Sequence, residues 1–259
     1  GPNVPFTPTH IVAILPLWPL RRWLPFAGLA IGAMVPDIAL FFPVVDYAQT
    51  HSPLGVFITC LPIGVAIFLL FDTVMRSPLV ALLPTWFQTR IDPRPQIPTT
   101  PRLKPHLFFY AGLFAAIVIG AFTHQIWDAF THKGRWGTDL VPALNATVAI
   151  GGYNVPGYKL FQYGSTFVGL PLLLVATIFS LNRTPATHPP ISASLTSKLL
   201  LPLSLCLVPM LVAVFALSAQ PNAYQALGVT IRLSGAIIMV WCIVYCIGLH
   251  VVASGKRDV

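Results

Sequence analysis

Six apolar stretches, each long enough or nearly long enough to cross a lipid bilayer, dominate this sequence. A membrane-spanning helix needs about 20 apolar residues. A shorter apolar stretch, residues 11–20, cannot span and is expected to form a half-membrane or interfacial helix capped by Thr7 or Thr9. The six long stretches run approximately over residues 23–42, 54–71, 107–127, 167–181, 199–217 and 231–252. The sequence therefore predicts an all-α, polytopic membrane helix bundle with about six spans plus an N-terminal half-membrane helix.

The charged residues support this assignment. Only 8% of the 259 residues are charged and 56% are hydrophobic, so the chain cannot cover a soluble surface of its size. The net charge of +8 comes from basic residues scattered among the loops. Membrane topology and anionic headgroups explain such a distribution, and no nucleic-acid partner is expected. The four cysteines lie in apolar stretches without a Cys-x-x-Cys pattern and are expected to be buried thiols.

The positions of the loops predict that the chain is divided into three regions. Residues 1–181 form a metal-site helical membrane domain, residues 182–190 a linker, and residues 191–259 a two-helix C-terminal membrane hairpin. Within the first region, residues 79–91 are expected to form an interfacial helix and residues 133–160 a loop. Gly1-Pro2 has the form of a protease-cleavage remnant, and no cleavable signal-peptide pattern opens the chain.

The distribution of Lys and Arg predicts the orientation. If the N-terminus lies outside and the loops alternate between the two sides of the membrane, few of the fifteen basic residues lie on the outer side. Those few are Lys133, Arg135, Lys159 and Arg232. We therefore expect a multi-pass membrane protein whose N-terminus lies on the outer side.

Ionisable groups within the apolar segments carry the strongest indication of function, because burying them in a membrane is costly. His124 and Asp128 are four residues apart on the third predicted span, so they share one helix face. His132 follows four residues later. An imidazole and a carboxylate with this spacing can bind one divalent ion. A hydrogen-bonded His–Asp pair is the common alternative for such a motif taken alone.

Three further residues strengthen the metal interpretation. The predicted topology brings His10, Asp37 and His51 to the same membrane face as His124, Asp128 and His132, although it was derived from charge alone. Six nitrogen and oxygen donors without a thiolate suit Zn²⁺, with Mn²⁺ or Fe as alternatives, and suffice for one or two ions. In contrast, His106, His188 and His250 lie toward the other face and are expected to be structural.

Residues next to the motif could bind a substrate. Lys133, Arg135 and Trp136 follow His132 directly and are expected to form either an interfacial belt or a clamp for a phosphate group. Tyr163 and Ser165 open the fourth span, where they either cap the helix or line the site. Asp72 and Arg76 have the helical spacing of an ordinary ion pair.

Taken together, several motifs resemble a known family. They are Pro5-Phe6-Thr7-Pro8-Thr9-His10, Pro36-Asp37, His51-Ser52, H-x-x-x-D-x-x-x-H at residues 124–132 and Gly164-Ser165-Thr166. In this order they resemble a bacterial family of multi-pass membrane proteins described only as a domain of unknown function. That family is similar, more distantly, to membrane-bound proteins assigned as metal-dependent hydrolases, and beyond them to the all-helical zinc-dependent phospholipase C and single-strand nuclease enzymes.

The resemblance covers roughly residues 5–181 and implies a ligand set. The positions that match ligands of the phospholipase-like enzymes are His10, Asp37, His51, His124, Asp128 and His132. It also implies that Asp128 bridges two ions. The soluble enzymes complete a third zinc site with an additional H-x-x-x-E, whereas this chain contains no Glu, so one or two ions are expected.

We therefore expect a membrane-embedded, metal-dependent hydrolase of a lipid or lipid-linked phosphoester, with its site on the outer (periplasmic) face. Asp37 and Asp128 would be the catalytic carboxylates, with Asp37 either a ligand or the general base. Two alternatives stay open. One is a non-enzymatic membrane protein with a structural metal, for which a closed coordination shell would argue. The other is a transporter, which the clustering of polar residues at one face instead of the midplane disfavours.

Overall fold

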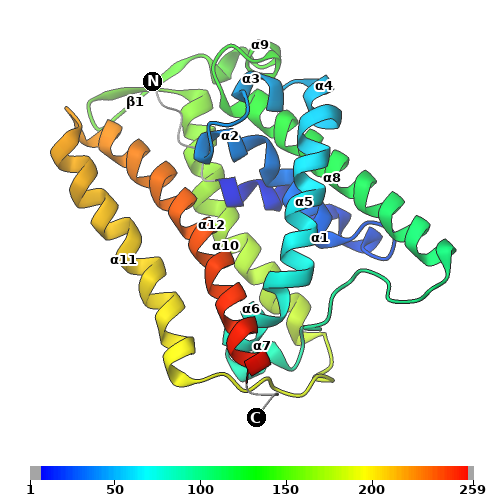
Figure 1. The fold of residues 1–259 in the computed structure, drawn as a ribbon. Coiled ribbons are helices and arrows are strands. Elements are labelled where there is room, and N and C mark those ends of the chain that lie inside the picture. The colour runs from blue at the N-terminus through cyan, green and yellow to red at the C-terminus, as the bar shows by residue number, and fades with distance from the viewer. Residues whose placement is uncertain (1–6, 256–259) are drawn as a thin grey trace. The chain divides into compact units, whose positions relative to one another are not determined.

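A computed structural model describes the backbone of residues 7–255 and the side chains of residues 7–252 (Figure 1). The N-terminal residues Gly1-Pro2 and Pro5-Phe6 lie outside the described residues, as do Lys256 and Arg257. The described chain is mostly helical, and five helices are long and apolar enough to cross a membrane. These five are Pro53–Leu82, Leu103–Thr131, Gly157–Asn182, Leu195–Ala219 and Ala223–Val252. The chain is thus an all-α, multi-pass membrane protein.

The first predicted span, residues 23–42, differs from the others. It forms α1 (Phe26–Met34), a single 3₁₀ turn η2 (Val35–Asp37) and the short helix α2 (Ile38–Phe41). The apolar helix from Phe26 to Phe41 is shorter than the five spanning candidates. Pro36 lies within the turn and has no backbone N–H to donate, so regular α-helical bonding is interrupted there. This irregular turn carries Asp37.

The second predicted span extends beyond its expected end at residue 71. It comprises α4 (Pro53–Gly55), a π-helical turn η3 (Val56–Cys60), α5 (Leu61–Leu70), a second π-helical turn η4 (Phe71–Met75) and α6 (Arg76–Leu82). The interfacial helix expected over residues 79–91 is instead divided between α6 and α7 (Thr85–Gln88), because Pro84 stands between them.

The N-terminal half-helix is present as η1 (Thr7–Leu20), a 3₁₀ helix that contains Pro16 and Pro19. The remaining elements are α3 (Tyr47–Thr50), α8 (Leu103–Thr131), α9 (Trp136–Leu140), η5 (Pro142–Leu144), β1 (Thr147–Ile150), β2 (Tyr153–Pro156), α10 (Gly157–Asn182), α11 (Leu195–Ala219) and α12 (Ala223–Gly255). The expected loop over residues 133–160 therefore has structure of its own. β1 and β2 pair antiparallel, and Gly151 and Gly152 turn the chain between them with φ values of 57° and 83°.

Two compact units divide the chain. The site unit contains Pro5–Phe68 and Thr100–Ile178, and the C-terminal unit contains Leu69–Thr99 and Phe179–Val259. The segment Leu69–Thr99 thus groups with the two C-terminal helices.

The site unit is centred on the crossing of α1 and α8. A Cβ atom on Gly32 would lie 2.3 Å from the carbonyl oxygen of Ile117, and one on Gly120 would lie 2.4 Å from the carbonyl oxygen of Leu29. Only glycine allows the two backbones to approach so closely, as in other packed membrane helices. Ile14 of η1 packs into the same buried cluster. This crossing fixes the position of the residues that follow α1 relative to those on α8.

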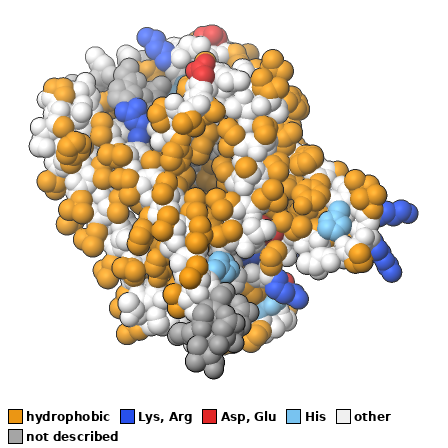
Figure 2. Space-filling model, viewed as in Figure 1, with side chains coloured by type: hydrophobic (Ala, Val, Ile, Leu, Met, Phe, Trp, Pro, Cys, Tyr) orange, Lys and Arg blue, Asp and Glu red, His pale blue; other side chains and the backbone are white. Residues whose placement is uncertain are grey.

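In the C-terminal unit, a buried ion pair holds the loop that contains Gln96 and Ile97 in place. Asp72 is buried, pairs with Arg76 at 2.8 Å, and accepts the backbone N–H groups of Gln96 and Ile97. The expected ion pair is therefore confirmed, and it also anchors a loop. Figure 2 shows hydrophobic side chains along α11 and α12. Most large apolar side chains of these helices, such as Leu203 and Val244, are exposed, as expected for helices that face lipid.

Candidate metal centre

Helix α8 supplies two of the candidate ligands from its last two turns. His124 and Asp128 are four residues apart, so both side chains emerge from the same face of this helix. Both are buried, with 0% and 2% exposure. Asp128 lies one turn before the end of the helix at Thr131. The pair therefore lies near one end of a membrane-spanning helix, and the helix itself fixes the spacing of the two side chains.

Asp37 reaches the same place from the 3₁₀ turn that follows α1. Its side chain is fully buried, and its Oδ2 accepts a hydrogen bond of 2.8 Å from the hydroxyl of Thr7. Asp37 Oδ1 has no hydrogen-bond donor. One carboxylate oxygen is thus held by the start of η1, and the other remains available for a ligand.

His51 lies between the short helices α3 and α4, and a side chain caps the N-terminus of each helix. Asp46 accepts the backbone N–H of Ala48 at the start of α3, and Ser52 accepts that of Gly55 at the start of α4. Pro53 follows at the first position of α4, where a missing N–H costs nothing. This local sequence fixes the backbone of His51, and Gln125 of α8 donates to the carbonyl oxygen of Ser52 at 3.1 Å.

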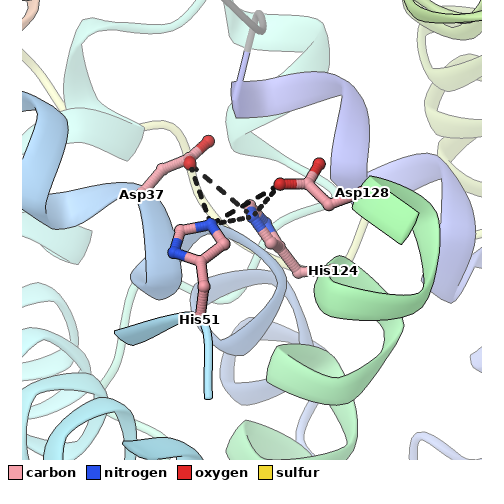
Figure 3. Close-up of side chains that lie close together, drawn as sticks. All are labelled: Asp37, His51, His124 and Asp128. Atoms are coloured by element: carbon pink, nitrogen blue, oxygen red, sulfur yellow. Dashed lines mark hydrogen bonds and ion pairs between the residues drawn. The ribbon is translucent and has the colours of Figure 1, made fainter. Parts of the chain in front are cut away.

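These four side chains converge (Figure 3). His51 Nε2 and His124 Nε2 are 3.3 Å apart. Each of these nitrogens lies 3.6 Å from Asp37 Oδ1 and 3.5 Å from Asp128 Oδ2. The four donor atoms all lie within 4.8 Å of one another. Two predicted carboxylates and two predicted imidazoles, from three separate segments, therefore meet at one buried point.

The hydrogen bonds of the two imidazoles indicate what the centre binds. His124 Nδ1 lies 2.8 Å from the carbonyl oxygen of Ala33, and His51 Nδ1 lies 3.0 Å from that of Tyr47. A carbonyl oxygen can only accept, so each Nδ1 carries a hydrogen, and in the neutral ring each Nε2 therefore presents a lone pair. Two nitrogen lone pairs then face two carboxylate oxygens. Such an arrangement requires a positive charge at its centre, and imidazole–carbonyl bonds of this kind orient the histidines of metal sites.

The distances fit a divalent ion. Tetrahedral Zn²⁺ binds nitrogen and oxygen at about 2.0–2.2 Å, which places neighbouring ligand atoms roughly 3.3–3.6 Å apart. The measured separations of 3.3–3.6 Å that involve the two histidines lie in this range. In addition, Asp37 Oδ1 and both oxygens of Asp128 are buried without a hydrogen-bond partner, which a protein does not tolerate without compensation. The residues could therefore hold a metal ion.

His10 and His132 lie on the other side of Asp128 from this centre. His10 Nε2 is 3.6 Å and His132 Nδ1 is 3.4 Å from Asp128 Oδ1, whereas Asp128 Oδ2 faces His51 and His124. The His10 ring also stacks on that of His124 at 3.9 Å. All six predicted ligands are thus buried in one cluster, but His10 and His132 do not share the four-residue centre.

Burial sets the charge of the three histidines that lie outside the spanning helices. Burial lowers the pKa of His10 to about 3, with His124 contributing, and burial also lowers the pKa of His132. Both rings are consequently neutral at pH 7, as a metal ligand must be. Burial opposes charge on His51 as well, but the neighbouring carboxylates of Asp128 and Asp37 outweigh it and raise the pKa. The two carboxylates thus favour positive charge between them.

The predicted substrate-binding residues differ in how close they lie to the cluster. Ser165 lines a small cavity beside His10, and Arg135 is half-buried next to Tyr47. Lys133 is exposed, and Trp136 is 57% exposed with its ring edge against Phe130. Tyr163 is 41% exposed, with the Lys159 ammonium over its ring. The structure therefore brings Ser165 to the cluster and leaves Lys133, Trp136 and Tyr163 at the surface.

The sequence did not identify several residues that support the cluster. Thr7 holds Asp37, Gln125 holds the backbone around His51, and Gln162 of α10 lies 3.3 Å from His132 Nε2. Such residues have no spacing pattern of their own, and only the fold brings them to the site. His106 and His250 bond backbone carbonyl oxygens, as expected for structural histidines, and Cys60 and Cys246 are buried, whereas Cys206 is exposed.

Comparison with known proteins places this cluster within a family. The family described as "Domain of unknown function (DUF4184)" matches residues 4–254, a range that includes all six candidate ligands. No curated protein and no solved structure matches the chain.

Proposed function

This chain belongs to the DUF4184 family, whose description assigns no activity. From the geometry of the site, we propose that the protein is a membrane-embedded, metal-dependent hydrolase of phosphoesters. The observation that carries the proposal is the convergence of unpaired donor atoms on both sides of the Asp128 carboxylate. A bound divalent ion such as zinc, which nitrogen and oxygen ligands suit, would supply a Lewis acid that activates water and polarises a phosphoryl oxygen.

The two carboxylates would have different roles. Asp37 has one oxygen bonded to Thr7 and the other at the four-residue centre, so it acts as a ligand, and no oxygen remains for the general-base role. Asp128 presents one oxygen to His51 and His124 and the other to His10 and His132. This geometry supports Asp128 as a bridge between two ions, with the site at His10 and His132 providing fewer protein ligands.

The position of the cluster supports a lipid or lipid-linked substrate. His124 and Asp128 lie in the last two turns of a spanning helix, near the depth at which the phosphate of a lipid is found. Arg135 follows the end of this helix and could hold an anionic group. With the orientation inferred from Lys and Arg, this end faces the periplasm of a bacterial inner membrane.

A structural metal is the second candidate function. Asp37, His51, His124 and Asp128 together provide four protein ligands, which is the number found in closed structural zinc sites. In that case the ion would hold the segments around α1 and α8 together. Hydrolysis requires a metal ion with a free coordination position. That ion would then have to be the one held by His10 and His132.

Metal analysis combined with hydrolysis assays tests the proposal. Purified full-length chain in phospholipid nanodiscs should contain one or two zinc ions per chain by elemental analysis. It should hydrolyse a phosphoester lipid, and a chelator should abolish this activity. A His124→Ala, Asp128→Ala variant should lose both properties, whereas His106→Ala should keep them. Stoichiometric metal without hydrolysis of any phosphoester would support the structural role, and normal metal content in the double variant would overturn the site itself.

A further inference from the structure

A cavity next to the cluster has a wall made of uncharged polar side chains. It is enclosed by η1, the end of α8 and the first turns of α10, and it encloses about 190 Å³ including its mouth. Its lining residues are Thr9, His10, Trp127, Thr131, Gln162, Ser165 and Thr166. No carboxylate, lysine or arginine lines it. Much of this volume is open to solvent, and the interior has room for about one water-sized group, so it suits a single hydroxyl.

The hydroxyl groups of this wall have already used their hydrogens. Ser165 and Thr166 both donate to the backbone carbonyl oxygen of Gln162, at 2.8 and 3.2 Å. A hydroxyl has one hydrogen and two lone pairs, so both oxygens can only accept from a further partner. A ligand in the cavity therefore meets hydrogen-bond acceptors on the α10 side.

The amide of Gln162 is oriented by Lys159. The ammonium of Lys159 donates to Gln162 Oε1 at 3.1 Å, and the Gln162 amide nitrogen then faces His132 Nε2 at 3.3 Å. Because an ammonium can only donate, this chain of bonds places the hydrogen of His132 on Nδ1, toward Thr131 and Asp128, as long as no ion is bound there. Thr131 can accept this hydrogen while its own hydroxyl donates to the carbonyl oxygen of Trp127 at 3.3 Å. A third hydroxyl of the wall is therefore also an acceptor.

His10 adds an atom that needs a partner. Its side chain is only 2% exposed, its Nε2 faces Asp128, and its Nδ1 is buried without a hydrogen bond. When Nε2 presents its lone pair to an ion, Nδ1 carries the hydrogen and becomes a donor. In that state the wall contains the acceptor oxygens of Ser165, Thr166 and Thr131 and the His10 Nδ1–H donor, and the indole N–H of Trp127 is a further donor among the lining residues.

We infer that this cavity binds a hydroxyl group of the substrate's alcohol portion, which makes the substrate a phosphoester of a polyol, such as a glycerol or sugar head group. A hydroxyl can both donate to Ser165 or Thr166 and accept from His10. A phosphate oxygen could not donate to those oxygens. An ammonium could not accept from His10, and it would be repelled by Lys159. The inference rests on the proposed function, in which the phosphate lies at the adjacent metal cluster.

Binding of two small phosphate monoesters tests this inference without requiring turnover. Glycerol 1-phosphate and propyl phosphate share the phosphate and the three-carbon chain and differ by two hydroxyl groups. Their affinities would be measured by calorimetry on zinc-loaded full-length chain in phosphatidylcholine nanodiscs, whose head group contains no hydroxyl. Glycerol 1-phosphate should bind about tenfold more tightly, as expected when a buried polar wall loses its partner.

A double variant and a matched control locate the effect. Ser165→Ala with Thr166→Val should remove the preference for glycerol 1-phosphate and leave the affinity for propyl phosphate unchanged. Thr177→Val is the control, because Thr177 makes the same type of hydroxyl–carbonyl bond on α10 but does not line the cavity. Equal affinities of both esters for the wild-type chain would overturn the hydroxyl site while leaving the phosphoester function intact. Failure to bind either ester would overturn the phosphoester function and the hydroxyl site with it.

Discussion

Single residues around the cluster decide how its ligands are oriented, and Thr7 is the clearest case. Its hydroxyl holds Asp37 Oδ2 at 2.8 Å inside the protein. Thr7→Val preserves the side-chain shape but removes this donor. Loss of such a supporting bond weakens metal binding by about 10–100-fold. We expect a decrease of this size in a titration against a chelating zinc indicator.

Thr230→Val is the matched control for that experiment, because Thr230 donates to the carbonyl oxygen of Ala226 on α12, in the C-terminal unit. It should bind zinc as the wild type does. Equal zinc affinity in Thr7→Val and wild type would mean that Asp37 is held by the backbone turn alone.

The Asp72–Arg76 pair makes a prediction about stability at the same scale. Asp72→Ala leaves a buried guanidinium without its partner, and the N–H groups of Gln96 and Ile97 lose their acceptor. Breaking a buried pair costs about 3–5 kcal/mol. The unfolding free energy of the variant in detergent should decrease by this amount, and residues 92–99 should become sensitive to protease.

An exposed pair provides the comparison. Asp92 and Arg94 are bonded at 2.8 Å, but the side chain of Arg94 is 77% exposed and that of Asp92 43%. Asp92→Ala should change the unfolding free energy by about 1 kcal/mol or less. Similar losses in the two variants would contradict the role given to the burial of Asp72.

At the residue scale, the sequence predicted the ligands better than their supports. His124 and Asp128 follow from a four-residue spacing, and His10, Asp37 and His51 from ionisable groups next to apolar stretches. Thr7 and Gln162 could not be predicted in the same way, because isolated Thr and Gln residues are common and acquire a role only from their partners in space. Tyr163 was expected either to cap the helix or to line the site, and its side chain is 41% exposed on α10.

At the scale of elements, the close crossing of α1 and α8 brings the two halves of the cluster together. The carbonyl oxygen of Ala33 on α1 accepts from His124 of α8, and Asp37 follows four residues later. The sequence predicted both helices from their apolar runs. It did not predict that Pro36 would end α1 early and turn Asp37 toward α8, because a proline near the end of an apolar run is also compatible with a kinked continuous span.

Gly32→Ala tests the importance of this crossing. The added methyl group would lie 2.3 Å from the carbonyl oxygen of Ile117, so the two helices must separate. Overpacking of this kind costs about 1–3 kcal/mol. We expect a lower melting temperature and weaker zinc binding, because His124 and Asp37 move apart with their helices.

Gly248→Ala provides the control within a helix. A Cβ atom there has no neighbour within 4 Å, and alanine favours a helix over glycine by up to about 1 kcal/mol. This variant should be as stable as the wild type or slightly more stable, with unchanged zinc affinity. Unaltered zinc binding in Gly32→Ala would show that the crossing does not position the ligands.

At the scale of the whole molecule, bound metal should stabilise the folded chain, because the ligands come from segments far apart in the sequence. An ion that binds only to the folded state adds about 2.7 kcal/mol to the free energy of unfolding when the free ion concentration is 100 times the dissociation constant. The melting temperature in nanodiscs should therefore fall with a strong chelator and recover when excess zinc is added. The His124→Ala, Asp128→Ala variant should melt at one temperature with or without chelator. A wild-type chain that does not respond to the chelator would contradict metal binding.

The separation of the ligands along the chain also has a consequence for biosynthesis. His51 and His124 are 73 positions apart, and a ribosome adds about 5–20 residues per second. Asp37 and His51 therefore emerge roughly 4–15 s before their partners, and until then they have only two of the four donors. The set of four donors is complete only once α8 has been made, so loading with an ion would be a late step in the maturation of the newly made protein.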